Sequence, residues 1–153
     1  MPKRGPKKLI YLLADGAHAR IVEQSSETGH FVTVSTLDGT AALEVVRAEQ
    51  RDEQPGRSFE SGSAARHGVG REDAYRRAKA EFAHKAASAL NRELAREARD
   101  AVVLVAPARL LPALREHLHA PVAAELAKDL IKVPDHDLGQ WLHSLSLAGE
   151  AAP

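Results

Sequence analysis

The sequence predicts one mixed α/β domain, and three observations indicate this class. Short apolar or alternating runs at 9–14, 19–23 and 31–35 predict strands that are joined by tight turns. A stretch that begins near residue 71 repeats apolar residues at three- and four-residue spacing, which is typical of an amphipathic helix. A second apolar run, at 101–106, predicts a strand that is covered on both faces. Strands that alternate with helices indicate a sheet with helices packed on its faces.

Composition limits the chemistry that the protein can use. The chain has 153 residues, which is enough to bury a core without disulfides or metals. It contains no cysteine, which excludes disulfides, thiolate catalysis and cysteine-ligated metals. Its 21 basic residues balance its 21 acidic ones, so an overall basic footprint for nucleic acid is missing and only a local patch could serve.

The two ends of the chain are predicted to lie outside the folded domain. Residues 1–8 are basic, and the apolar run after them has six residues, too few for a signal peptide or a membrane span. We therefore expect a cytoplasmic protein without a membrane segment. Residues 1–8 are expected to form a flexible, solubilising arm, with anion binding as the alternative. The domain is expected to span 9–147, followed by a disordered tail at 148–153.

The first three strands are predicted to form an antiparallel meander. The run at 9–14 ends at Asp15-Gly16, where Asp15 is expected to cap a turn. The run at 19–23 pairs back as a hairpin, and Gly29 lies in the turn that precedes the alternating run at 31–35. Residues 38–50 are compatible with either a helical turn or an extended edge.

Residues 54–70 are predicted to form a polar loop. The segment holds four glycines, three serines and two arginines, and almost nothing that a core could bury. A loop of this length inside a compact domain is usually either functional or disordered.

The second half of the chain is predicted to alternate helices and strands. The helix that opens at Arg71 ends near residue 100, and the strand at 101–106 follows. Residues 108–119 are expected to be helical, with Pro112 in the first turn. Residues 121–126 form a fifth strand or, on their Ala, Glu and Leu content, a helix.

The last predicted element is a helix that runs to Leu147. Either Asp135 or Asp137 is expected to cap it. Its apolar face is expected to hold Leu138, Trp141, Leu142 and Leu145.

The predicted order is β-β-β-α-β-α-β-α. A meander followed by right-handed crossovers gives a mixed five-stranded sheet with helices on its faces. This is the order of ribonuclease-H-like domains, and we take that fold as the prediction.

Metal and nucleophile chemistry find little support in the sequence. A two-metal nuclease needs several carboxylates at strand ends, whereas the sequence offers Asp15, Asp129 and, on the second strand, only Glu23, and the run at 101–106 has none. The eight histidines include no His-Glu-x-x-His motif, so neither a metal nor a cofactor is predicted. Ser58 and His67 are near each other in the sequence, which is weak support for a nucleophile and its base.

The loop and the start of the long helix are the candidate binding site. Backbone amides at a helix N-terminus, together with arginines, can bind an anion such as an RNA phosphate. A solvated connection explains the same residues equally well. The residues that would bind RNA are Arg57, Ser58, Arg66, His67 and Arg71, with Asp15, Arg20 and Lys128 in possible support.

Several segments in this order resemble the bacterial family named for a requirement in attachment to host cells. The resemblance covers roughly residues 8 to 145, and Pro107-Ala108 stands where the family often has two prolines. It is carried by the sequences at 15–20 (DGAHAR), 55–59 (PGRSF), His67, 103–111 (VLVAPARLL) and 128–130 (KDL).

The architecture also resembles, more distantly, the central domain of archaeal and eukaryotic class I release factors. In that domain a Gly-Gly-Gln loop precedes the long helix and enters the peptidyl-transferase centre. Residues 62–67 here read GSAARH and lack that tripeptide. The resemblance therefore implies a non-catalytic module whose loop contacts ribosomal or transfer RNA. The alternatives are an ester or peptidyl-tRNA hydrolase that uses Ser58 or His67, and a factor that acts on attachment through a protein partner.

Overall fold

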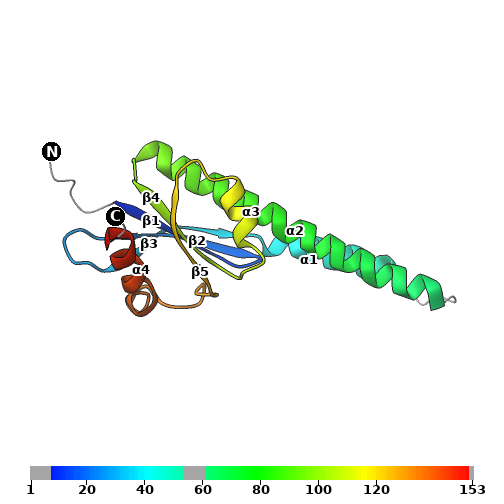
Figure 1. Ribbon diagram of the computed structural model, residues 1–153. Helices are drawn as coiled ribbons and strands as arrows, with labels where there is room; N and C mark the ends of the chain where they lie inside the picture. The colour runs from blue at the N-terminus through cyan, green and yellow to red at the C-terminus, as the bar shows by residue number, and fades with distance from the viewer. Residues whose placement is uncertain (1–7, 54–60, 152–153) are drawn as a thin grey trace.

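The protein folds around a five-stranded mixed sheet with the strand order β3-β2-β1-β4-β5 (Figure 1). The computed structural model describes residues 8–53 and 61–151, and the side chains of residues 8–49 and 73–145. The strands are β1 (Leu9–Ala14), β2 (His18–Gln24), β3 (Phe31–Asp38), β4 (Ala101–Ala106) and β5 (Val122–Ala127). The helices are α1 (Thr40–Glu53), α2 (Ser61–Arg96), α3 (Leu111–Glu116), the 3-10 turn η1 (Asp135–Asp137) and α4 (Gly139–Ala151).

The sheet confirms the predicted meander and the crossovers that follow it. β1 pairs antiparallel with β2, and β2 with β3, whereas β4 lies parallel to β1 and β5 parallel to β4. Gly29 turns the chain between β2 and β3 at a φ of 75°, a left-handed conformation that glycine adopts without a steric penalty. The mixed α/β class and the strand count are therefore as predicted.

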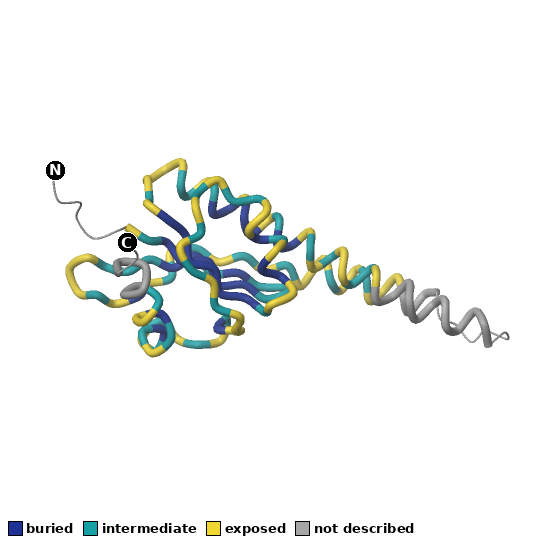
Figure 2. Tube along the Cα trace, viewed as in Figure 1, coloured by how far each residue is buried: buried dark blue, intermediate teal, exposed yellow. Residues whose placement is uncertain are grey.

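The two faces of the sheet carry separate cores because successive side chains of a strand point to opposite sides. Ile10 and Leu12 face α2 and α3, and Tyr11 and Leu13 face α4. Every residue of β4 is buried, as predicted for a strand that is covered on both faces (Figure 2). On the first face α2 contributes mostly small side chains, which let it lie close to the sheet: Phe82, Ala83, Ala86, Ala89 and Leu90.

Helix α2 begins earlier than the sequence predicts. The structure has residues 61–70 in the helix, so this part of the predicted loop is wrong, and residues 54–60 lie outside the description. The glycines favoured a loop, but extending an existing helix costs about 1 kcal/mol per glycine and avoids a new nucleation event. Glycine content alone therefore predicted that α2 begins later in the chain than it does.

The structure also decides the segments that the sequence left open. Residues 40–53 form α1, and residues 122–127 form a strand because pairing with β4 overrides their helical propensity. Helix α3 covers only 111–116 of the predicted 108–119, with Pro112 in its first turn. Helix α4 continues past Leu147 to Ala151, into the segment expected as a tail.

Helices α1 and α2 lie side by side and extend away from the sheet (Figure 1). We call α1 and residues 61–79 of α2 the α1–α2 hairpin. The 36 residues of α2 make it about 54 Å long, whereas strands of six to eight residues span only about 20–27 Å. No helix in the described residues is long and apolar enough to span a bilayer.

Candidate functional site

Asp15 closes the turn at the end of β1, as predicted. Its Oδ1 accepts hydrogen bonds from the backbone amides of Ala17 at 2.7 Å and His18 at 2.6 Å. The turn leads directly into β2 and fixes the position of the His18 side chain.

His18 lies between two carboxylates at the base of the α1–α2 hairpin. Its Nδ1 is 3.4 Å from Asp15 Oδ2, and its Nε2 is 3.9 Å from Asp38 Oδ1. Hydrogen bonds from the Thr40 hydroxyl and amide lower the pKa of Asp38, and these bonds start α1 directly after β3. This polar cluster joins the sheet edge to the hairpin.

Arg20 joins the meander to the C-terminal segment instead of turning toward that cluster. One terminal guanidinium nitrogen donates to the carbonyls of Leu130, Ile131 and Val133, at 2.6–3.1 Å. The other donates to Asp135 Oδ1 at 2.6 Å, and Nε donates to Thr33 Oγ1 at 3.2 Å. Every guanidinium nitrogen is thus bonded within the domain, and Arg20 has a structural role here.

Asp135 is the partner that sequence reasoning missed, because the sequence predicted it as a helix cap. Its carboxylate accepts hydrogen bonds from the Thr33 hydroxyl and amide, in addition to Arg20. Burial raises the pKa of Asp135, but the hydrogen bonds from Thr33 and then from Arg20 outweigh burial and hold it below its usual value of 3.8. The sequence places more than a hundred residues between Arg20 and Asp135, so no local pattern signals the pair.

We expect Asp135→Asn to flatten the acid limb of the protein's stability curve. Because the folded pKa lies below the unfolded one, the charged carboxylate stabilises the fold fully above about pH 5, and this contribution disappears as the pH falls through the folded pKa. Urea unfolding between about pH 6 and pH 2.5 measures the effect. The gap in the free energy of unfolding between the native protein and Asp135→Asn should become narrower as the pH falls. In the Thr33→Val background this gap should already be partly reduced. An equally wide gap at all pH values contradicts the assignment.

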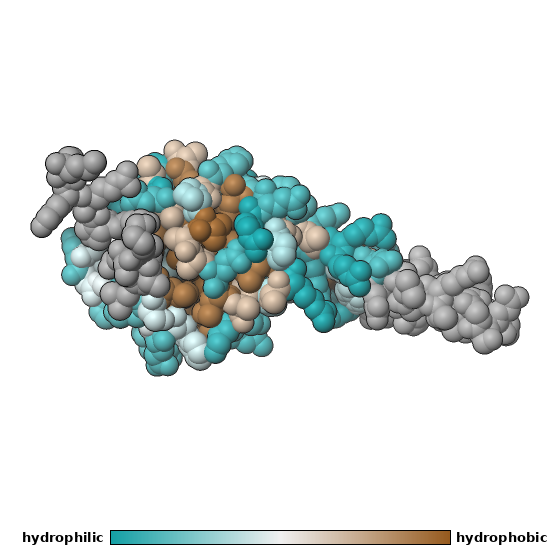
Figure 3. Space-filling model, in the orientation of Figure 1, coloured by the Kyte–Doolittle hydropathy of each residue, from teal (hydrophilic) through white to brown (hydrophobic). Residues whose placement is uncertain are grey.

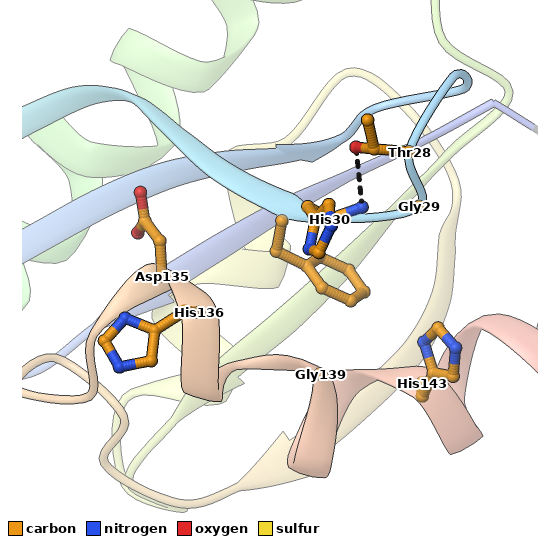
Figure 4. Close-up of a pocket in the computed structure, with 8 residues that line it drawn as sticks. Thr28, Gly29, His30, Asp135, His136, Gly139 and His143 are labelled. Atoms are coloured by element: carbon orange, nitrogen blue, oxygen red, sulfur yellow. Dashed lines mark hydrogen bonds between the residues drawn. The ribbon is translucent and has the colours of Figure 1, made fainter.

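A shallow groove opens beside Asp135, between the β2–β3 turn and the start of α4 (Figure 4). It has a volume of about 320 Å³. His30, His136 and His143 stand around it from three parts of the chain, and their imidazoles do not converge. The groove has a polar rim but does not bring a set of ligating atoms together.

Lys128 covers an aromatic ring near the end of β5. Its ammonium nitrogen lies 4.0 Å from the centroid of the Trp141 ring, a cation–π contact between β5 and α4. Lys128 and Asp15 follow parallel strands and so lie at the same edge of the sheet, with β4 between their strands.

Comparison with known families identifies the group to which this architecture belongs. The family model described as "Protein required for attachment to host cells" matches residues 11–142. The chain belongs to this host-attachment family. The match runs from β1 to α4 and includes the Asp15 turn, the Arg20 contacts and the α1–α2 hairpin. No curated protein matches the chain.

Most of the residues predicted to bind RNA in this host-attachment protein lie outside the residues or side chains that the structure describes. Arg57 and Ser58 lie outside the described residues. Arg66, His67 and Arg71 lie in α2, where the structure describes their backbone but not their side chains. The predicted roles of all five, and of Asp15, Arg20 and Lys128 as supporting groups, stay predictions.

Proposed function

We propose that this host-attachment protein is a non-catalytic, cytoplasmic binding module whose α1–α2 hairpin contacts ribosomal or transfer RNA. The observation that carries the proposal is the extension of the hairpin beyond the sheet (Figure 1). Among the described side chains of α2, those that pack into the core begin at Phe82, and residues 73–81 add none to it.

The described surface of the hairpin carries several cations, together with exposed apolar residues of α1 such as Val45. Figure 3 shows hydrophilic residues along it, whereas apolar residues gather over the sheet. Arg47, Arg76, Arg77 and Lys79 are all exposed, and they point to phosphate as the group that this surface would meet. Glu44 and Asp73 pair with Arg47 and Arg76, so any phosphate contact would compete with these exposed ion pairs.

The topology supports an RNA-facing interpretation. The strand order 3-2-1-4-5, with a meander and two parallel additions, supports the ribonuclease-H-like prediction. The long helix after residue 60 resembles the arrangement in the release-factor central domain, where the segment before that helix approaches ribosomal RNA. Because residues 62–67 read GSAARH instead of containing Gly-Gly-Gln, we propose binding and not peptidyl-tRNA hydrolysis.

Co-sedimentation with purified ribosomes at several salt concentrations tests the proposal. We expect the native protein to bind at low salt and to dissociate as salt rises, because phosphate contacts release counterions. The double variant Arg57→Ala/Arg66→Ala should lose about tenfold or more in affinity and show a salt slope smaller by about two.

The matched control replaces two exposed arginines of the sheet domain, Arg92→Ala/Arg109→Ala, and removes the same charge. It should bind as the native protein does. Absence of ribosome and tRNA binding at low salt, or equal losses in both double variants, contradicts the proposal. A hydrolase would show turnover that His67→Ala abolishes, and among the described side chains no serine is hydrogen-bonded to a histidine.

A further inference from the structure

A cluster of three potential metal ligands lies between α2 and α3, outside the site described above. His84 comes from α2, and Glu116 and His117 from the end of α3. Each offers one ligand atom, and these atoms all lie within 4.8 Å of one another. In the described residues no other group of three histidines and acids is this close.

The fold holds His84 and His117 against each other through Asn91. The side-chain amide of Asn91 donates to the His117 carbonyl at 2.7 Å and accepts from the His119 amide at 2.9 Å. Asn91 and His84 are seven residues apart on α2, so they lie on the same face of the helix. The segment that carries His117 is therefore fixed beside His84 by bonds that use neither imidazole.

Helix α3 is held independently from its other side. The guanidinium of Arg115 forms two hydrogen bonds with Glu125 of β5, at 2.6 and 2.9 Å, and the side chain of Leu114 is buried in the core. Arg115 is thereby drawn toward β5. Within the described part of the chain, Glu116 takes part in none of the ion pairs and remains able to serve as a ligand.

The two imidazoles lie directly against each other, with a ligand atom of each within 4.8 Å of the other's. Their ring centroids are 3.7 Å apart with an interplanar angle of 58°. Both rings are half-buried, and Glu116 is exposed beside them. Two imidazoles and a carboxylate are the ligands of many three-residue zinc sites, in which water takes the fourth position.

We propose that His84, Glu116 and His117 bind one zinc ion. Zinc–nitrogen bonds of about 2.0–2.1 Å place tetrahedral ligand atoms about 3.4 Å apart, so side-chain rotations must bring the three ligand atoms closer together and turn the two rings outward around the ion. Imidazole donors favour zinc and its transition-metal neighbours over magnesium and calcium, which prefer sites made of oxygens alone. The bound ion would join the sheet-packed part of α2 to α3. This inference does not depend on the proposed RNA binding.

No local sequence pattern marks this site, because the two histidines are far apart in the chain and belong to no metal-binding motif. The histidines near the groove in Figure 4 do not offer an equivalent, since their rings stand apart.

Calorimetric titration of the full chain, purified without a histidine tag, with zinc chloride tests the proposal. We expect one zinc per chain, and dissociation constants raised about a hundredfold by His84→Ala and by His117→Ala. Glu116→Gln and the positioning variant Asn91→Ala should each raise the dissociation constant for zinc about tenfold. Cobalt should give the visible absorption of a tetrahedral site, and a hundredfold excess of free zinc over the dissociation constant should raise the Tm by about 5–10 °C.

His119→Ala is the matched control, because His119 is exposed and joins the Asn91 contacts only through its backbone amide. It should bind zinc as the native protein does. Melting curves without zinc separate loss of the site from loss of the fold. Equal zinc affinity in the native protein, His84→Ala and His117→Ala overturns the proposal, and so does a loss in His119→Ala as large as theirs.

Discussion

Replacing Arg20 with alanine is expected to lower the free energy of unfolding by about 3 kcal/mol. The change leaves the carbonyls of the 130–133 segment and the Asp135 carboxylate without their shared donor. The Arg20 side chain is only 11% exposed, but Asp135 is 40% exposed and water can reach it. We therefore expect a loss at the lower end of the range of about 3–5 kcal/mol that follows the removal of one partner from a fully buried pair.

Urea unfolding monitored by circular dichroism measures this loss. Arg109→Ala removes an exposed arginine and should change stability by less than about 0.5 kcal/mol. Arg20→Lys keeps the charge but cannot reach the carbonyls and Asp135 together, so it should recover less than half of the loss. The double variant Arg20→Ala/Asp135→Asn should be more stable than Arg20→Ala alone. A loss in Arg20→Ala no larger than in the Arg109 control would show that the contacts add nothing.

Phe82→Ala is expected to cost about 3–4 kcal/mol and to loosen the base of the α1–α2 hairpin. Phe82 is 6% exposed and, among the described side chains of α2, is the first that packs into the core. Its ring packs directly over Gly39, between β3 and α1, where a methyl group would overlap the ring carbons. The alanine variant therefore leaves a cavity where the hairpin leaves the sheet.

The contact between Gly39 and Phe82 can be tested from both sides. Gly39→Ala alone should destabilise by about 2 kcal/mol, because a buried ring cannot move aside freely. In the Phe82→Ala background the same change should be neutral or stabilising, because the added methyl group enters the cavity. Gly139→Ala is the control, since its new methyl group would meet Phe31 only at an ordinary 3.9 Å. Equal costs of Gly39→Ala in both backgrounds would exclude this packing.

Local patterns predicted the elements that local physics determines. The runs that became β1 and β4 are apolar throughout, and both strands are almost entirely buried. The Asp15 turn and Gly29 were predicted from their residue types and are confirmed by a side-chain cap and a positive φ. The apolar face of the last helix is confirmed too, with Leu138 and Leu142 fully buried.

Segments with mixed signals needed their tertiary partners. The glycines in residues 61–70 predicted a loop where the structure has helix. Residues 122–127 favour helix by propensity, but β4 offers them a parallel edge and they form a strand. The candidate binding residues at 57, 58, 66, 67 and 71 stay predictions.

The sequence by itself determined the fold class, the meander, the buried strands and the family, because each depends on residue types over a few positions or on their order. Only the tertiary structure decided where α2 begins and which distant polar groups meet. Arg20 contacts Asp135, and His84 contacts His117, although the two residues of each pair are far apart in the chain and no local sequence pattern relates them. Such pairs form once the sheet order and the helix packing bring their backbones together, so the chemistry they offer becomes visible only in the folded chain.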